Sequence, residues 1–270
     1  MNSDVSKLMA MVCGQNRNDF DMNSIPLEIR NQIDNALESV FIGNSTLLWI
    51  NGGKLIDAWN TALNDLRDNL PNTKMLAIPG NHDFIVNGYP CFKNAFMQKG
   101  DKKYFRMDNG TIHMIFLFMV WDDAEFSKAQ EKWLIKQLEE IPQEETVIVI
   151  SHCYVTGSGY IDSAANRNWG DIPSVVATIC PILEKYNVDL HLSGHNHFFE
   201  FLEKDSVDYM IIGGMGGKLD KNLEYSSPYS KWLDNDNFGW LDMKVFAGYL
   251  ELTVYKYDGT VLTTKRVATK

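Results

Sequence analysis

The chain has 270 residues, of which 45% are hydrophobic and 22% are charged, so it is long enough to bury a core and is neither disordered nor fibrous. Its formal net charge of −10 at pH 7 disfavours general binding to nucleic acids or to anionic membranes. The longest apolar run, 114–121, is far shorter than the roughly 20 residues that a membrane-spanning helix needs. We therefore expect a globular domain with no transmembrane segment.

The signals for a cellular compartment are weak. Residues 1–7 lack a basic stretch followed by an apolar one, so we expect no secretory signal in this chain. Two N-glycosylation sequons, at Asn44 and Asn109, favour a secretory or organellar route. The four cysteines are widely spaced and form no C-x-x-C pair, which is typical of isolated buried thiols. The compartment stays open.

The first third of the chain alternates predicted strands and helices. Short apolar runs predict three strands, and apolar residues at a helical period predict two helices between them. In chain order these are strand 7–13, helix 26–41, strand 46–50, helix 58–70 and strand 74–78. The order is βαβαβ, so the front half of the chain is mixed in character.

The middle of the chain begins with a predicted hairpin, 104–107 with 111–120, around the turn sequence Asp108-Asn-Gly110. The long loop 154–171 is rich in Gly, Ser and Asn and is expected to lie over a site. After residue 198, strand-like runs joined by Gly or Asp turns predict an antiparallel tail. The remaining elements are helix 127–141, strand 146–150, helix 172–186 and strand 188–192. No linker or repeat divides the chain, so we predict a single domain, 1–270.

Aromatic residues are frequent in the loop-like stretches of the second half. They either form a surface for a partner or pack the long loops, and we favour packing. The residues are Tyr154, Tyr160, Trp169, Tyr225, Tyr229 and Trp232.

Three of the predicted strands run into residues that can bind metal ions. Strand 74–78 leads into Gly80-Asn-His-Asp83, strand 146–150 into His152, and strand 188–192 into Gly194-His-Asn-His197. Buried strands deliver such residues at their carboxyl ends. Imidazole nitrogens and an amide oxygen are good ligands for zinc, iron or manganese. We therefore predict one shared site with Asn81, His82, His152, His195 and His197.

These three motifs, in this order and strand context, resemble motifs III, IV and V of the calcineurin-like metallophosphoesterases. The stretches 209–219 and 237–262 are similar to the closing strands of small purple acid phosphatases of the tartrate-resistant kind. The resemblance covers nearly the whole chain. It implies an α/β (α+β) fold of four layers, αββα, with two mixed β-sheets flanked by helices. It also implies two metal ions between strand ends, with His82 and Asp83 as the catalytic proton-donor pair.

The chain departs from this family at the two motifs that supply acidic ligands. The resemblance implies a metal-binding aspartate after the first strand, where Gln15 stands, and a metal-bridging aspartate after the second, which we place at Lys54. Asp57 falls at the position of the iron-binding tyrosine and is the acidic side chain that can substitute for the missing ligands. An ammonium group about 4 Å from a divalent metal is repelled by several kcal/mol even at an effective dielectric near 20. We therefore expect either no metal or one zinc, iron or manganese ion, rather than an intact dinuclear centre.

Three functions follow from this pattern. The first is a catalytically inactive pseudophosphatase that serves as a structural or interaction module and has a protein partner. The second is a phosphomonoesterase that uses one metal ion held by residues such as His152 and His195. The third is a protein that binds phosphate or a phosphorylated ligand through Arg17 and Lys54, because Gln15 and Lys54 in place of two carboxylates make the pocket more positive by about +3. We favour the first, because hydrolysis needs a metal-activated water that lysine and arginine cannot supply at neutral pH.

Overall fold

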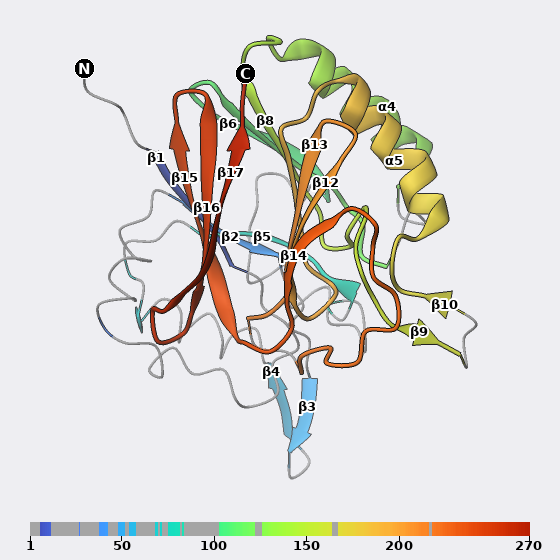
Figure 1. Cartoon of the computed structure of the whole chain (residues 1–270), viewed down its shortest axis with the longest axis vertical. Coiled ribbons are helices and arrows are strands. Elements are labelled where there is room, and N and C mark those ends of the chain that lie inside the picture. Colours follow the sequence, from blue (N-terminus) through green and yellow to red (C-terminus); the bar gives the residue numbers. More distant parts are fainter. Residues whose placement is uncertain are drawn as a thin grey trace.

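The computed structural model shows two β-sheets that face each other, with helices on the outer side of one of them (Figure 1). The residues that it describes are 6–11, 27, 38–42, 48–51, 54–57, 68–69, 71, 75–81, 83, 103–121, 126–163, 167–215 and 218–270.

The first sheet has six strands and joins both ends of the described chain. Its order is β17-β16-β15-β1-β2-β5, in which β1, β2 and β5 are parallel and β1 pairs antiparallel with β15. The strands are β1 (Ser6–Met11), β2 (Glu38–Ile42), β5 (Met75–Ile78), β15 (Gly239–Phe246), β16 (Tyr249–Lys256) and β17 (Val261–Ala268). The sheet is therefore mixed, with an antiparallel tail as predicted.

The second sheet has seven strands in the order β14-β12-β13-β11-β8-β7-β6. Strands β7, β8, β11 and β13 are parallel to one another, and the edge pairs β6-β7 and β12-β14 are antiparallel. The strands are β6 (Phe105–Asn109), β7 (Ile112–Phe116), β8 (Thr146–Ile150), β11 (Leu190–Ser193), β12 (Phe199–Lys204), β13 (Val207–Ile212) and β14 (Ser230–Asp234).

Two helices cover the outer face of the second sheet (Figure 1). Helix α4 (Lys128–Glu140) begins at Ser127, whose side chain accepts a hydrogen bond from the Gln130 amide. Helix α5 (Pro173–Lys185) begins with Pro173 in its first turn, where the missing N–H costs little, and has a second proline, Pro181, in its interior. Both helices occupy the predicted ranges. Among the described helices, none is long and apolar enough to span a membrane.

Strand β8 shows how the layers are held together. Ile148 and Ile150 belong to an apolar cluster between the two sheets, whereas Val147 and Val149 belong to a second cluster under the helices. Burying each such side chain stabilises the fold by about 1.5–3 kcal/mol. A strand buried on both faces reads as a continuous apolar run, which is why the sequence predicts it well. The predicted fold class, with two mixed sheets and flanking helices, is confirmed.

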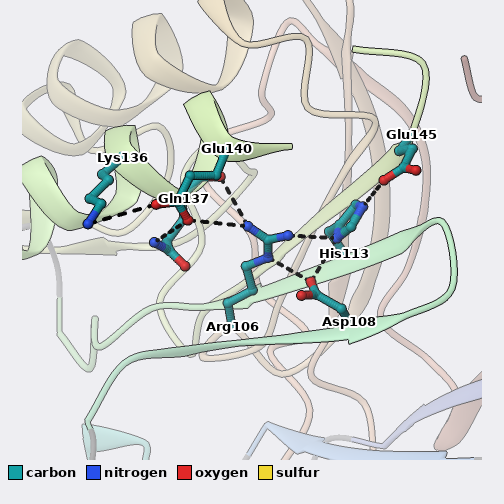
Figure 2. A network of polar contacts seen from close by, with 7 residues as sticks. All are labelled: Arg106, Asp108, His113, Lys136, Gln137, Glu140 and Glu145. Atoms are coloured by element: carbon teal, nitrogen blue, oxygen red, sulfur yellow. Dashed lines mark hydrogen bonds and ion pairs between the residues drawn. The ribbon is translucent and has the colours of Figure 1, made fainter. Parts of the chain in front are cut away.

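A network of charged side chains ties the hairpin β6-β7 to the end of α4 (Figure 2). Arg106 bonds to Asp108 at 2.6 Å and lies 3.8 Å from Glu140. The ring of His113 bridges two carboxylates, with Nδ1 2.7 Å from Asp108 and Nε2 2.5 Å from Glu145. Burial alone would raise the pKa of Asp108, but the hydrogen bonds from Arg106 and His113 outweigh it and lower that pKa. The network fixes the start of β8 beside the hairpin.

Two predictions for the first third are wrong. The predicted helix 26–41 overlaps strand β2, because the β-branched and aromatic residues from Val40 to Ile42 also fit a strand. The predicted strand 46–50 is not in either main sheet: β3 (Leu48–Asn51) and β4 (Lys54–Asp57) form a separate antiparallel hairpin (Figure 1). Two glycines at 52 and 53 provide the sequence of a tight turn between them.

Candidate functional site

Three strand ends meet at one place between the sheets. Asn81 follows β5 of the first sheet, while His152 and His195 follow the neighbouring strands β8 and β11 of the second. The backbone of Gly194 donates a hydrogen bond to the carbonyl of His152 at 2.9 Å, which joins the two histidine segments. The strand order therefore brings together residues that are more than 100 positions apart in the sequence.

The side chains of these three residues converge on one another. His152 Nε2 lies 3.0 Å from Asn81 Oδ1 and 3.1 Å from His195 Nδ1. The two imidazole rings are nearly perpendicular, at 89°, and Asn81 and His152 are buried. One oxygen and two nitrogens with lone pairs are thus within reach of a single small ligand.

Two of the separations among these donor atoms can be compared with those around a metal ion. Two metal bonds of about 2.1 Å place their donor atoms about 3.0 Å apart at a right angle and about 3.4 Å apart at a tetrahedral angle, so the observed 3.0 and 3.1 Å lie nearer the right-angled case. The same separations also suit direct hydrogen bonds, so the geometry is compatible with a metal-bound and with a metal-free site. In the described part of the chain, no three histidine, cysteine, aspartate or glutamate side chains are placed to hold a metal ion. The amide of Asn81 is therefore needed to complete a set of three.

His195 sits in an unusual backbone conformation. Its φ is 68°, in the left-handed region that costs a non-glycine residue free energy. The next residue, Asn196, compensates, because its buried side-chain amide donates to the carbonyls of Ser158 at 2.9 Å and Trp169 at 3.1 Å. The turn that presents His195 is thus held by the loop 154–171, which lies against the site as expected.

His197 is held by a different segment. Its Nδ1 lies 2.8 Å from the carbonyl of Lys218, and its backbone N–H donates to Asp220 at 2.8 Å. A carbonyl accepts only from an N–H, so the ring proton is on Nδ1 and Nε2 is the nitrogen with the lone pair. Gly213 lets the backbone at 213 lie directly against that of Asn196, because a Cβ at position 213 would lie 1.8 Å from the Asn196 carbonyl oxygen.

The remaining predicted site residues are placed as follows. Asp83 is buried, and its carboxylate accepts a hydrogen bond from the Gly80 N–H at 2.6 Å, which closes the turn that carries Asn81. Lys54 and Asp57 begin and end β4, and their side chains lie outside the description. Gln15, Arg17 and His82 fall outside the described residues.

The strand order contradicts the premise that placed the second acidic motif at Lys54. That placement required 46–50 to be the second parallel strand of the first sheet, but the strand between β1 and β5 is β2. The residues that follow β2 are Gly43 and Asn44. The role of Lys54 as an anion-binding side chain stays a prediction, because its side chain lies outside the description.

A buried carboxylate that the sequence analysis missed anchors the loop over the site. Both oxygens of Glu200 accept hydrogen bonds from Ser158, at 2.8 Å from its N–H and 2.6 Å from its hydroxyl. Burial raises the pKa of Glu200, although the hydrogen bonds from Ser158 oppose this effect. A second carboxylate, Asp171, accepts from Thr156, from the Gly157 N–H at 2.9 Å and from the Tyr225 hydroxyl at 2.7 Å. The sequence signal that could have revealed the buried carboxylate is the glutamate at position 200, inside the otherwise apolar run 198–202.

Aromatic rings surround His195. The ring centroid of Trp169 lies 5.1 Å from that of His195, and those of Tyr154 and Trp121 lie 6.1 and 6.2 Å away. Tyr154 and Trp169 are buried, in agreement with the expected packing role. Trp121 and Tyr160 remain 38% and 36% exposed.

A cavity of about 740 Å³ opens at the opposite ends of the same strands. Its lining includes Asp189 and Asp208 at the starts of β11 and β13, together with Lys204 and Lys231. The pKa of Asp208 is raised to about 6 by burial and by the nearby carboxylates Glu203 and Asp189. This cavity is separate from the histidine site, which lies beyond the carboxyl ends of β8 and β11.

The sequence model of the calcineurin-like phosphoesterase family matches residues 27–199. Rabbit (Oryctolagus cuniculus) tartrate-resistant acid phosphatase type 5 is 21% identical over 131 residues, which cover 48% of this chain and 38% of that protein. The matched region therefore covers well under half of the length of this curated relative.

Two solved structures share the fold over nearly the whole chain. Purple acid phosphatase PPD1 from yellow lupin (Lupinus luteus) seeds has a TM-score of 0.78 and 16% identity, covering 99% of this chain and 54% of that one. A structure described as GAP50, the anchor in the inner membrane complex of Plasmodium, has a TM-score of 0.69 and 16% identity, covering 98% of this chain and 89% of that one. At such identities the likeness establishes the fold alone.

Proposed function

Because the chain belongs to the calcineurin-like phosphoesterase family, we propose that it is a purple-acid-phosphatase-like protein with a degenerate metal site that acts as a non-hydrolytic structural or interaction module. The observation that carries the proposal is the strand order of the first sheet. Gln15 comes shortly after β1 and Asn44 follows β2. Both family positions for acidic ligands then hold neutral amides.

The loss of both carboxylates bears directly on a dinuclear centre. Two divalent ions 3.5–4 Å apart repel each other by about 15–20 kcal/mol at an effective dielectric of 20. Anionic ligands normally offset this repulsion, and a bridging carboxylate does so for both ions at once. Asn81, His152 and His195 are neutral ligands and do not supply that charge.

A single metal ion is compatible with the retained half of the site. Asn81, His152 and His195 would hold it, and His197 Nε2 presents a further lone pair in the same motif. A metal ion bound there would polarise a phosphate oxygen. The second candidate function, a phosphomonoesterase with one metal ion, is favoured by this convergence of three donor atoms.

The fold is compatible with a non-enzymatic role. A structure that shares it over 98% of this chain is described as an anchor in a membrane complex. We extend that kind of role to this chain as part of the proposal, with a protein as the partner.

Elemental analysis combined with a phosphate-release assay tests the proposal. We expect at most one equivalent of zinc, iron or manganese per chain, and no phosphate release from phenyl phosphate above that of the His152→Ala variant. Two metal equivalents together with turnover would overturn the proposal. One equivalent with turnover that His152→Ala abolishes would select the phosphomonoesterase instead.

A further inference from the structure

The cavity of about 740 Å³ at the starts of β11 and β13 takes no part in the proposed function. Its volume lies within the range of about 300–1,000 Å³ that pockets for small molecules have. The second sheet lines it with the start of β11 and the turn from β12 to β13, and the first sheet with residues 268–270 at the end of β17. Figure 1 shows these segments at the same end of the molecule as the C-terminus. The cavity therefore opens between the ends of the two sheets, on the side away from His152 and His195.

Two lysines of the lining are already paired with carboxylates. Lys204 donates to Glu184 at 2.9 Å and also to Asp205. Lys231 lies 3.7 Å from Glu203. Two ammonium groups thus face three carboxylates, which leaves a net charge of −1 for this group of side chains. Neither lysine supplies a positive charge that is free to neutralise a further carboxylate.

Asp208 is a further carboxylate of the lining, and it has no ion pair or side-chain hydrogen bond with the residues that the structure describes. It lies directly opposite Glu203 in the β12-β13 ladder, where two like charges are destabilising. Burial, Glu203 and Asp189 all raise its pKa, to about 6. Burial also raises the pKa of Asp189, but Lys270, the third lysine of the lining, partly offsets this, whereas no cation does so for Asp208.

The alternation of side chains along β13 gives Asp208 its direction. Val207 and Tyr209 pack under the helices, so Asp208 points to the other face, which it shares with Met210 between the two sheets. An unpaired carboxylate on the inner side of a cavity lowers stability at neutral pH. Such a perturbed acidic group in a cavity is typical of a ligand-binding position.

The spacing of the carboxylates indicates the shape of the ligand. Because neighbouring strands lie about 4.8 Å apart, the positions of Glu203, Asp208 and Asp189 along β12, β13 and β11 spread over roughly 10 Å. A cation that meets more than one of them must carry charges that are separated along its length. A linear aliphatic polyamine has this form, and each of its ammonium groups donates charge-assisted hydrogen bonds to carboxylates. A single metal ion fits less well, because no three potential ligands among the described residues are placed to share one.

We propose that this cavity binds a linear aliphatic polyamine, with Asp208 as its main anionic contact and Glu203 and Asp189 beside it. The ligand is held by charge and hydrogen bonds and undergoes no reaction. The inference is independent of the function proposed for the histidine site, which lies at the other ends of the strands.

Calorimetric titration of the full chain with spermidine tests this inference, in about 0.1 M salt to screen the charges of distant parts of the surface. We expect one equivalent to bind. Asp208→Asn should weaken binding about tenfold, because a charge-assisted contact is lost. Asp236→Asn is the matched control, since it removes the same charge from an exposed side chain beyond the other end of β14. The control should keep the affinity within about twofold.

A second variant changes the affinity in the opposite direction. Lys231→Gln removes the ammonium group that lies near Glu203, so spermidine should bind at least about twofold more tightly. Asp208→Asn should unfold at the same or a higher temperature than the unaltered protein at pH 8, because it removes the charge that faces Glu203. A weaker affinity of this variant is then due to the lost contact and not to misfolding.

The pH dependence gives an independent readout. Spermidine binding should weaken between pH 7.5 and pH 5, because Asp208, with its pKa of about 6, becomes protonated while the ammonium groups stay charged. No histidine belongs to the lining, so the loss reports on the carboxylates.

Three results would overturn the inference. The first is the absence of spermidine binding to the unaltered protein, and the second is equal weakening by Asp208→Asn and Asp236→Asn, which would indicate attraction to the net charge alone. The third is an affinity that stays the same from pH 7.5 to pH 5. Metal content and phosphate release at the histidine site would not alter any of these outcomes, so the two proposals fail or stand separately.

Discussion

His191 is a fully buried histidine in the middle of β11. Its Nε2 lies 2.9 Å from the hydroxyl of Ser151, which itself donates to the Cys153 carbonyl, so the ring proton is on Nε2. Nδ1 is buried with no hydrogen-bond partner among the residues that the structure describes. Burial lowers the pKa of His191 from 6.5 to about 3. The ring is therefore neutral at physiological pH.

This depressed pKa predicts acid sensitivity. Below pH 6.5 the unfolded chain takes up a proton at His191 that the folded chain does not, so stability falls as the pH drops from 6.5 towards 3. The full loss from this one group is on the order of 4–5 kcal/mol. His191→Gln keeps a donor for Ser151 but cannot titrate, so its free energy of unfolding should fall less between pH 7 and pH 4. Urea denaturation at several pH values measures this difference, and parallel curves for the two proteins would contradict it.

The two positions at which we propose that acidic ligands are missing, Gln15 and Asn44, allow a gain-of-function experiment. Restoring carboxylates with Gln15→Asp and Asn44→Asp should raise zinc binding by about one further equivalent, because the added anionic ligands offset the repulsion between two cations. Gln15→Asp with Lys54→Asp is the matched control and should gain less. Elemental analysis after dialysis against zinc measures both. A larger gain in the control would restore the placement of the second motif at Lys54.

At the scale of elements, the loop 154–171 depends on Glu200 in β12. Glu200→Gln replaces one acceptor oxygen by an NH₂ group, which then faces a donor of Ser158 or a neighbouring hydroxyl. We expect a loss of about 1–3 kcal/mol in stability. Amide hydrogen exchange should accelerate at 157–160 more than in β8 or β11. Glu203→Gln, an exposed position on the same strand, is the control and should leave exchange in the loop unchanged. Equal effects of both substitutions would count against the anchoring role.

Local sequence patterns predicted the helices and strands whose caps and apolar faces lie within their own residues. The helices α4 and α5 carry their caps and apolar faces within their own sequence, and β8 and β11 are buried on both sides. Strand β2 was missed because its apolar residues also satisfy a helical period, and only pairing with β1 and β5 decides the matter. That error is why the second motif was placed at Lys54, after 46–50, and not directly after β2.

The sequence predicted the part of the candidate site that lies directly after the strands. Asn81, His152 and His195 follow apolar runs, so their meeting could be inferred before the sheets were known. The anchoring by Glu200 and the contact of Trp169 with His195 could not, because each joins segments that lie far apart in the sequence. No periodicity within either segment specifies such a contact.

At the scale of the whole molecule, the first sheet makes the two ends of the described chain interdependent. Strand β1 lies between β15 and β2, with Ala10 opposite Leu241 on one side and Val40 on the other. The apolar cluster between the sheets draws residues from β5, β8, β11 and β15–β17. Two independent domains would not contribute strands to one sheet in this way. The domain boundaries 1–270 stay a prediction.

This arrangement predicts that the fragment 103–270 does not fold alone. Without β1, the edge of β15 and the inner face of the first sheet are exposed, and such edges associate with other chains. We expect the fragment to aggregate and to lack the near-ultraviolet circular dichroism of its packed aromatic residues. Size-exclusion chromatography and circular dichroism measure this. A monomeric fragment with a cooperative unfolding transition would contradict the interdependence.

The pairing of β1 with β15 also has a consequence for protein synthesis. The ribosome adds Ala10 to the growing chain about 230 residues before it adds the partner residue, Leu241. At 5–20 residues per second, this interval is roughly 10–50 seconds. During that time the nascent first strand has no partner on its β15 side, and non-local pairing of this kind is slow. The first sheet is thus completed only after β15 has been synthesised, and until then β1 can pair only with β2.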